Sequence, residues 1–238
     1  MKTSVHLGPQ TGKGALIRDV ILGGQDGLVN VLGIVLGVAV ATQDVSVTII
    51  AGLASAFTES FSMAAVAYTS TKAEEDFYYS ELERERYEIK HFPEIERKEI
   101  RAIYSNKGFK GRLLDEIVRH ITRSERIWLN VMMREEVGLS IEHKNAFKSA
   151  LIVLFAALIG SLSTIIPFFA ALFFGISIGA AMIVSLVLSA VILFAVGFFK
   201  ARITIGVDWK SGLELMIIGL LSAGVGYVVG AVTGGLLI

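Results

Sequence analysis

Long apolar stretches separated by short polar ones dominate the chain. Residues 149–199 contain no charged side chain, and neither do residues 215–238. A helix that crosses the hydrocarbon core of a bilayer needs about 20 predominantly apolar residues. The first stretch is therefore long enough for two membrane spans, with a turn expected near residues 168–176, where Pro167 and Gly175 interrupt the run. The second stretch provides one more span.

Two further apolar segments lie toward the N-terminus, at about 18–42 and 46–70, and residues 42–46 form a short polar turn between them. The predicted spans are therefore five. Hydrophobic residues make up 53% of the chain and the mean hydropathy is +0.64, which is well above the usual range of soluble domains. The pattern predicts an all-α, polytopic membrane protein in contact with the lipid bilayer.

Between the second and third spans, residues 71–145 carry most of the charge, with helical apolar spacing and few breakers. We predict three helices in this insert. The first continues out of the second span to about His91 and ends before Pro93, because the residue before a proline is pushed out of helical geometry. The second helix runs to about Ser105, and the third covers about 111–138.

Lysine and arginine determine the expected orientation, because they stay on the cytoplasmic side of short loops. With the N-terminus inside, the cytoplasmic segments 1–18, 71–148 and 200–210 contain all 22 lysines and arginines. The outside turns contain none. The predicted segments are a cytoplasmic N-terminal segment (1–17), transmembrane helices 1 and 2 (18–70), a cytoplasmic helical domain (71–145) and transmembrane helices 3 to 5 (146–238).

Composition and the N-terminal sequence exclude several classes of protein and of binding site. The segment MKTSVHLGPQTGKGALIRDV has no apolar core followed by a small-residue cleavage site, so we expect no secretory signal peptide and a retained first span. No targeting extension is visible, which favours a prokaryotic cell membrane over a vacuolar one. The lack of cysteine excludes disulfide frameworks, zinc–thiolate sites and iron–sulfur clusters. Zero net charge without a long basic run argues against a nucleic-acid partner.

The insert contains a glutamate-rich stretch on both sides of Pro93, and its spacing suits ligands for a cation. Glu85 and Glu88 are three residues apart on the first helix. Glu96 and Glu99 have the same spacing on the second. Each pair therefore lies on one helix face. The turn at Pro93 allows the two pairs to face each other.

The third predicted helix adds Met132, Met133 and Glu136, of which Met132 and Glu136 share a face. Carboxylates alone suit Ca²⁺, Mg²⁺ or Mn²⁺, whereas a thioether shifts preference toward softer divalent transition ions such as Fe²⁺. On this interpretation residues 71–145 form a metal-binding domain. The alternative is an ordinary solvated helix surface, on which nearby basic side chains pair with the glutamates: Arg84, Arg86, Arg97 and Lys98.

Two acidic residues lie inside predicted spans. Asp26 lies about eight residues into the first span, and Glu59 lies near the middle of the second. A carboxylate at that depth is costly unless it is paired, protonated or facing water, and no lysine or arginine is available inside the spans. The remaining states are a protonated carboxyl and a bound cation, and alternation between them would make a cation/proton exchanger. The alternative is a protonated carboxyl hydrogen-bonded to a neighbouring helix. Neutral ligands nearby are Asn30, Ser62 and Met63.

Four glycine pairs have the four-residue spacing that permits close contact between membrane helices. Such spacing supports a compact bundle and is also compatible with a dimer. The pairs are Gly23 with Gly27, Gly33 with Gly37, Gly175 with Gly179, and Gly226 with Gly230.

Several motifs together resemble the vacuolar iron transporter family over almost the whole chain. They are RDVILGGQDGLVNVLGIVLGVA, AGLASAFTESFSMAAVAY, the glutamate-rich insert, Ile103-Tyr104, Trp128 and MMREEVGL, in that order. The resemblance implies a homodimer of five-span subunits that moves Fe²⁺ out of the cytoplasm in exchange for protons. The resemblance also implies transport of Mn²⁺ and of other divalent ions such as Co²⁺, Ni²⁺ or Zn²⁺. It also implies that the cytoplasmic helices gather ions before transfer.

By position, the family's membrane aspartates correspond to Asp19 and Asp26, and its methionine in the second span corresponds to Met63. One position departs from the family pattern. Eight residues before Met63, where the family often has a glutamate, this chain has Ser55, and Glu59 follows one helical turn later. Either Glu59 takes over that role, or selectivity and coupling differ. The candidate pathway residues are Asp19, Asp26, Asn30, Glu59, Ser62 and Met63, and the candidate insert ligands are Glu85, Glu88, Glu96, Glu99, Met132, Met133 and Glu136.

Two other classes of function compete with transport. Glu88-Ile-Lys-His91 fits the Glu-x-x-His pattern of a membrane-anchored di-iron carboxylate oxidase, but such a bundle uses two of these motifs. Neither His120 nor His143 has a glutamate three residues before it. A metal-responsive membrane sensor would explain the insert but not the intramembrane acids. We therefore expect a transporter and no enzyme.

Overall fold

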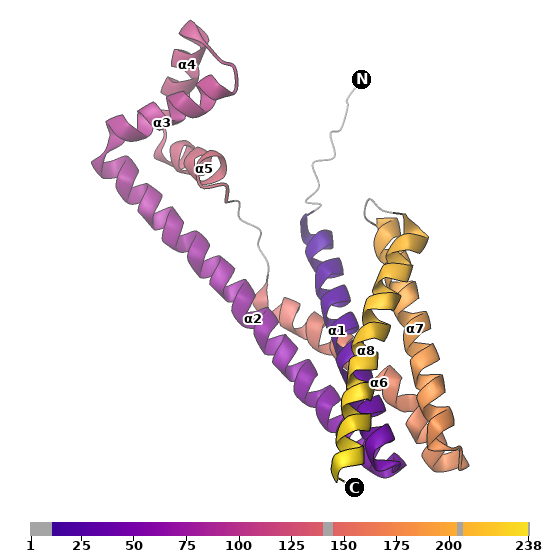
Figure 1. Cartoon of the computed structure of the whole chain (residues 1–238). Helices are drawn as coiled ribbons and strands as arrows, with labels where there is room; N and C mark the ends of the chain where they lie inside the picture. Colours follow the sequence, from indigo (N-terminus) through magenta and orange to yellow (C-terminus); the bar gives the residue numbers. More distant parts are fainter. Residues whose placement is uncertain (1–10, 140–144, 204–206, 238) are drawn as a thin grey trace, which may run out of the picture. The chain divides into compact units, whose positions relative to one another are not determined.

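The computed structural model describes residues 11–139, 145–203 and 207–237. Most of the predicted N-terminal segment 1–17, and His143, lie outside these residues. All regular secondary structure in the described part is helical, as predicted (Figure 1). The helices are α1 (Thr11–Thr42), α2 (Val45–His91), α3 (Pro93–Asn106), α4 (Gly111–Thr122), α5 (Glu125–Glu135), α6 (Ala146–Phe174), α7 (Ile178–Ile203) and α8 (Asp208–Leu237).

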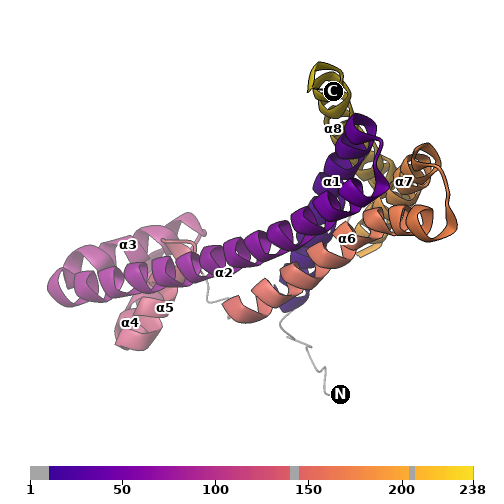
Figure 2. The same ribbon diagram turned by 90° about the horizontal axis from the view of Figure 1, so that it is seen from below.

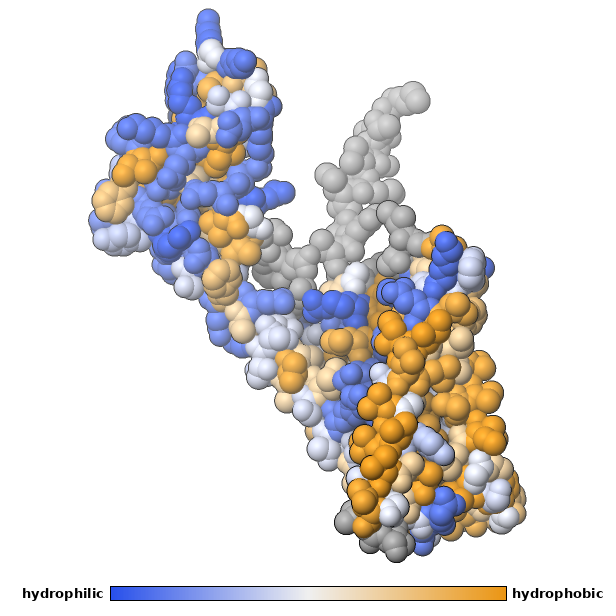
Figure 3. Space-filling view, viewed as in Figure 1, coloured by the Kyte–Doolittle hydropathy of each residue, from blue (hydrophilic) through white to orange (hydrophobic). Residues whose placement is uncertain are grey.

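Five of these helices, α1, α2, α6, α7 and α8, are long and apolar enough to cross a membrane. The prediction of five spans is thus confirmed. The chain divides into two compact units, Met1–Thr69 with Lys144–Ile238, here called the membrane unit, and Ser70–His143, here called the insert unit. Figure 3 shows hydrophilic residues over most of the insert unit and apolar residues over most of the membrane-unit face in view. An apolar surface of this kind is one that lipid can cover.

Helix α1 lies at the centre of the membrane unit and packs against α6, α7 and α8 (Figures 1 and 2). Glycine allows two of these contacts to be very close. A Cβ atom on Gly23 would lie 2.7 Å from the carbonyl oxygen of Val153 in α6, and one on Gly37 would lie 2.7 Å from that of Gly226 in α8. The predicted glycine pairs of α1 and α8 therefore lie at helix contacts within one chain. The pair Gly175 and Gly179 does not, since a Cβ on either would meet open space.

A two-residue turn, Gln43–Asp44, joins α1 to α2. Gln43 adopts a positive φ of 50°, which reverses the chain direction. The Asp44 carboxylate then accepts hydrogen bonds from the backbone N–H groups of Ser46 (2.7 Å) and Val47 (3.0 Å). These N–H groups have no partner inside the helix, so the aspartate caps the start of α2.

The turn between α6 and α7 differs in detail from the prediction. Pro167 lies inside α6, which continues to Phe174 and ends at Gly175 in the left-handed conformation (φ 67°). Glycine adopts this conformation without strain, which explains why the helix ends there. A proline inside a membrane helix is tolerated where neighbouring helices surround it, and Pro167 is buried in the bundle. The predicted turn at 168–176 therefore began too early, although Gly175 does end the helix as its position indicated.

The insert unit contains one more helix break than predicted. Helix α3 begins at Pro93 and ends before Gly108, close to the predicted limits. The third predicted helix, 111–138, is instead two helices, because α4 ends at Thr122 and α5 begins at Glu125. One straight helix of that length would extend for about 40 Å. The break allows the buried residues of both helices to join one apolar core, which contains Ile89, Ile100, Leu114, Val118, Ile121, Trp128, Leu129, Met132 and Met133.

Candidate functional site

Five glutamates of the insert unit come together from α2, from α3 and from the residue that follows α5. Glu85, Glu88 and Glu96 form one group, and Glu96, Glu99 and Glu136 form a second. Within each group, one carboxylate oxygen per residue lies within 4.8 Å of the others, a separation that one bound cation could bridge. Glu96 belongs to both groups. We call the five residues the acidic cluster.

The two innermost members of the acidic cluster are almost completely buried. Glu85 is 0% exposed and Glu96 is 4% exposed. One oxygen of each, Oε2, has no hydrogen-bond partner among the described residues. A buried carboxylate oxygen without a donor is unfavourable unless a proton or a cation binds it. The cluster therefore has two buried acceptor atoms without a donor among the described residues, which a bound cation could satisfy.

Burial and mutual repulsion change the protonation of the acidic cluster. Loss of hydration raises the pKa of Glu96 to about 7, and the neighbouring charge of Glu99 adds to the effect. Burial also raises the pKa of Glu136 to about 7, with repulsion from Glu85 and Glu99 as the next causes. Although Glu136 as a residue is exposed, one of its oxygens lies against Glu96 and Glu99. Protons therefore leave these two groups near neutral pH.

Basic side chains pair mainly with glutamates outside the acidic cluster. Arg86 bonds Glu83, and Arg97 lies 2.7 Å from Glu94. The exception is Arg84, which lies 2.9 Å from Glu81 and 3.0 Å from Glu85. The solvated-surface interpretation thus fits the outer glutamates, whereas Glu85 is the cluster member that an ion pair reaches among the described residues.

The two methionines lie beside the acidic cluster in sequence but inside the apolar core. Met132 is 0% and Met133 1% exposed, and both belong to the core of the insert unit. Packing alone accounts for their burial. The backbone N–H of Glu136 donates to the carbonyl of Met132 (2.9 Å), which holds Glu136 at the end of α5. The methionine sulfurs remain predicted ligands only.

His91, the second residue of the Glu-x-x-His match, is exposed and engaged by its own helix. Its Nδ1 lies 2.8 Å from the carbonyl oxygen of Tyr87, and its ring stacks on the Tyr87 ring with 3.9 Å between centroids. It belongs to neither carboxylate group of the described residues. His91 is therefore not placed to act as an imidazole ligand of a di-iron site.

A second site lies in the membrane unit, where α1 and α2 border a groove of about 530 Å³. Asn30 of α1 donates a hydrogen bond to the Glu59 carboxylate of α2 across this pair of helices. Ser55 and Glu59, one turn apart, both line the groove. We call this the polar groove. Its lining residues are Asp26, Ala54, Ser55, Thr58, Glu59, Ser62 and Met63.

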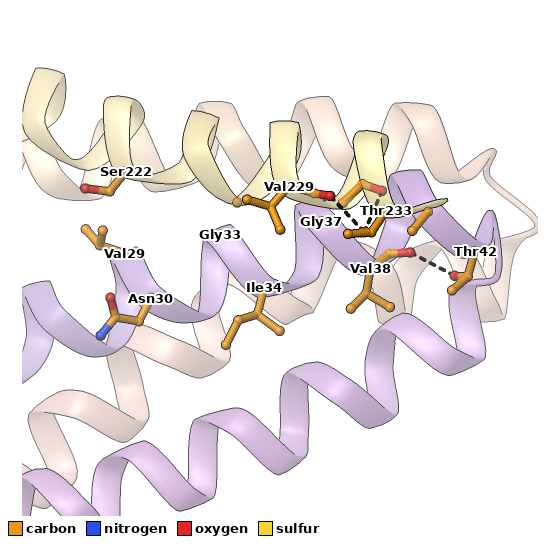
Figure 4. A pocket seen from close by; sticks show the side chains of 13 residues that line it. Val29, Asn30, Gly33, Ile34, Gly37, Val38, Thr42, Ser222, Val229 and Thr233 are labelled. Carbon is orange, nitrogen blue, oxygen red and sulfur yellow. Dashed lines mark hydrogen bonds between the residues drawn. The ribbon is translucent and has the colours of Figure 1, made fainter. Parts of the chain in front are cut away.

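Asn30 also borders a neighbouring groove of about 480 Å³ between α1 and α8, which is mostly apolar (Figure 4). Gly33 and Gly37 form part of its floor on α1, and Val229 and Thr233 line it on α8. The Thr233 hydroxyl donates to the carbonyl of Val229 (2.8 Å), so its polar atom is satisfied within α8. Asn30 thus lines the apolar groove and also donates its hydrogen bond to the Glu59 carboxylate.

Asp19 is separate from the polar groove. It is 5% exposed, accepts a hydrogen bond from the Ser149 hydroxyl of α6, and lies 3.6 Å from Arg18. Sequence reasoning missed Ser149 because it lies 130 positions from Asp19 and has no local signal. Thr58 was also missed, although its helical spacing with Ser55 and Ser62 could have indicated it.

Comparison with known proteins gives a consistent result. The sequence model described as "VIT family" matches residues 17–231. Proteins named "Vacuolar iron transporter 1" are 33% identical in Oryza sativa subsp. japonica, over 90% of this chain and 84% of the relative, and 32% identical in Tulipa gesneriana, over 89% and 85%. A "Vacuolar iron transporter" of Plasmodium falciparum is 29% identical over 91% and 81%. These matches confirm the resemblance and argue against an enzyme.

Proposed function

The chain belongs to the VIT family, and on that basis we propose that it is a divalent-metal transporter that moves Fe²⁺ out of the cytoplasm in exchange for protons. The observation that carries the proposal is the polar groove. Two ionisable residues, Asp26 and Glu59, line one groove between helices that are apolar enough to span a membrane. Intramembrane carboxyls without a basic partner mark ion pathways by default.

In this proposal the acidic cluster gathers the ion first. Its buried oxygens of Glu85 and Glu96 lack hydrogen-bond donors among the described residues, so a cation can bind there without displacing an internal partner. Because Glu96 and Glu136 lose their protons near pH 7, the site would accept and release metal under cytoplasmic conditions. A site that binds metal when its glutamates are ionised and releases it when they are protonated suits capture followed by transfer.

The polar groove carries out the membrane step. Met63 and Asp26 bind the ion from α2 and α1, and Glu59, held by Asn30, provides the second carboxylate. A proton and a metal ion compete for the same carboxylate oxygens, since each neutralises a charge that the membrane interior disfavours. Entry of protons from the far side would therefore release the metal there. This competition is the proposed coupling.

The ligand types admit more than one metal. Carboxylates accept Fe²⁺ and Mn²⁺ alike, and a thioether from Met63 favours the softer transition ions. We therefore propose Fe²⁺ as the principal cargo, with Mn²⁺, Co²⁺, Ni²⁺ and Zn²⁺ as further substrates. The names of the relatives support iron alone.

Orientation and location complete the proposal. Because all lysines and arginines lie in segments on one predicted side, we propose that the N-terminus and the insert unit are cytoplasmic. The prokaryotic cell membrane stays a prediction, since the named relatives are eukaryotic. We also propose a homodimer. A second copy would cover the polar groove, which in a single chain would expose Glu59 and Ser62 to lipid.

The experiment that tests transport is Fe²⁺ flux into proteoliposomes with an imposed pH gradient and an internal pH dye. The native chain should carry iron in one direction and protons in the other, and both Asp26→Asn and Glu59→Gln should abolish the two fluxes. Glu214→Gln is the matched control, because Glu214 is an exposed carboxyl of α8 outside both sites. Iron binding without flux in the native chain would instead identify a metal sensor.

A further inference from the structure

The insert unit has a second concave surface, between α3 and α4, that is basic. It is a pocket of about 470 Å³ whose lining contains four arginines and one aspartate, a formal net charge of +3. Arg97 and Arg101 lie one turn apart on α3, and Arg119 of α4 lies one turn before Arg123, which follows that helix with helical backbone angles. We call it the arginine pocket. Its lining residues are Arg97, Arg101, Asp115, Val118, Arg119, Thr122 and Arg123.

Two of the four arginines are already paired, and two are available. Arg101 of α3 donates to the Asp115 carboxylate of α4 (2.6 Å), an ion pair that holds the two helices together across the pocket. Arg97 pairs with Glu94 on its own helix. Arg119 and Arg123 have no ion-pair or hydrogen-bond partner among the described residues. The pocket therefore presents two unneutralised guanidinium groups beside two that are fixed in position.

Arg97 connects the pocket to the core of the insert unit. Its guanidinium carbon lies 5.7 Å from the centre of the Trp128 ring, within cation–π range. Trp128 is only 4% exposed and belongs to the apolar core. Contact with a buried ring restrains the Arg97 side chain, which lowers the entropy lost when an anion binds.

We propose that the arginine pocket binds a small anion carrying two or more phosphate groups, held mainly by Arg119 and Arg123 and completed by Arg97 and Arg101. Guanidinium groups form paired hydrogen bonds with phosphate oxygens, and a cluster of them on two helices matches a ligand with several such oxygens. Arg119 and Arg123 are the two arginines of the lining without an acidic partner among the described residues, and a ligand with two phosphate groups can offer each of them its own pair of oxygens. The phosphates could belong to a free molecule or to a lipid headgroup.

The test uses the full chain in a neutral detergent and pyrophosphate as the probe. Calorimetry measures binding, and tryptophan emission reports its location in a Trp209→Phe background, since Trp128 is then the only tryptophan. We expect saturable binding with a change in Trp128 emission. Replacing Arg119 and Arg123 by Gln should weaken binding by about tenfold or more, because each removes a charge-assisted hydrogen bond.

The matched control replaces Arg112 and Arg126 by Gln, which removes the same charge from the insert unit outside the arginine pocket. Equal weakening by both double variants, or no saturable binding to the native chain, would overturn the proposal. Arg119→Lys with Arg123→Lys guards against misfolding: it keeps the charge but loses the paired geometry, and it should bind with intermediate affinity. Unchanged metal binding by the insert checks that each variant is folded.

Lipid nanodiscs separate the two sources of phosphate. Pyrophosphate binding is compared in discs of phosphatidylcholine alone and in discs that also contain a phosphoinositide. Weaker apparent binding in the second discs, seen equally with the native chain and with the Arg112 and Arg126 control variant, would assign the pocket to lipid headgroups. Equal binding in both discs would assign it to a free phosphorylated molecule. Either result supports an anion site.

Discussion

Glu96 is the residue on which the chemistry of the acidic cluster depends most, because it belongs to both carboxylate groups. It is almost completely buried, and its Oε2 has no donor among the described residues. Its protonation therefore affects every metal position that the cluster can offer. The raised pKa of about 7 sets the pH at which that change takes place.

We predict that metal binding by the insert unit weakens as the pH falls through neutrality. Glu96 and Glu136 have pKa values of about 7, so they are mostly ionised above that pH and mostly protonated below it. Only the ionised form binds a cation, and affinity should be about tenfold or more higher at about pH 8 than at about pH 6. Calorimetry with Mn²⁺ on the Asp26→Asn chain measures the insert site. Affinity independent of pH would contradict this assignment.

A second residue-scale prediction concerns Ser55 and Glu59, where we expect the chain to depart from the family pattern. Ser55 and Glu59 line the same groove one turn apart, so either position can offer a carboxylate to it. As in the flux experiment above, Glu59→Gln should abolish iron flux. Adding Ser55→Glu to that variant should restore a large part of the flux. Ser55→Gln in the same background, which adds bulk without charge, should restore none.

At this scale the sequence indicated the right residue types but not their environments. The three-residue spacing of Glu96 and Glu99 was enough to predict that they share a face, and the structure places them in one group. The sequence could not predict which glutamate each arginine pairs with. Ion pairing of Arg84, Arg86 and Arg97 depends on rotamers and on neighbouring helices. Whether these groups bind metal stays a prediction.

At the scale of whole elements, the close contact between α1 and α8 depends on glycine. A Cβ on Gly37 would lie 2.7 Å from a backbone oxygen of Gly226, and backbone cannot move aside easily. Gly37→Val should therefore destabilise the membrane unit by about 1–3 kcal/mol. The measurement is thermal unfolding in detergent.

The control for this prediction is Gly224→Val on α8, where a Cβ would meet nothing within 4 Å. It should change stability by less than about 0.5 kcal/mol. Equal unfolding temperatures for the two variants would show that α1 and α8 separate or shift without cost. The glycine spacing would then have no role in packing.

Helix boundaries with a local chemical cause were the ones that the sequence could predict. Pro93 begins α3 and Gly175 ends α6, each because of its own backbone limits. The break between α4 and α5 has no such residue: it falls at Arg123–Ser124, where neither proline nor glycine stands. Ser124 is the N-cap residue of α5 but makes no capping hydrogen bond, and the break mainly allows Ile121 and Trp128 to pack into one core.

For the whole molecule, the exposed polar groove is the strongest argument for assembly. We predict that Ser62→Cys, in a chain that has no native cysteine, is cross-linked to its counterpart in a second copy by a short bis-maleimide in native membranes. In a two-fold dimer, equivalent residues near the axis approach each other. Val187→Cys, on the exposed apolar face of α7, is the control and should remain uncross-linked. Cross-linking of both or of neither would argue against this interface.

The two-residue turn at Gln43–Asp44 also has a consequence for how this site can evolve. Counted from the turn, Asp26 and Glu59 are both roughly 20–25 Å along their helices, so the hairpin keeps them at matching heights. A helix offers an equivalent position on the same face at every turn. A ligand can therefore migrate by one turn along α2, from position 55 to 59, and still find a partner on α1, where Asn30 follows Asp26 by one turn. The hairpin therefore offers a carboxylate several equivalent positions, one per helical turn, and a change from one to the next leaves the fold as it is.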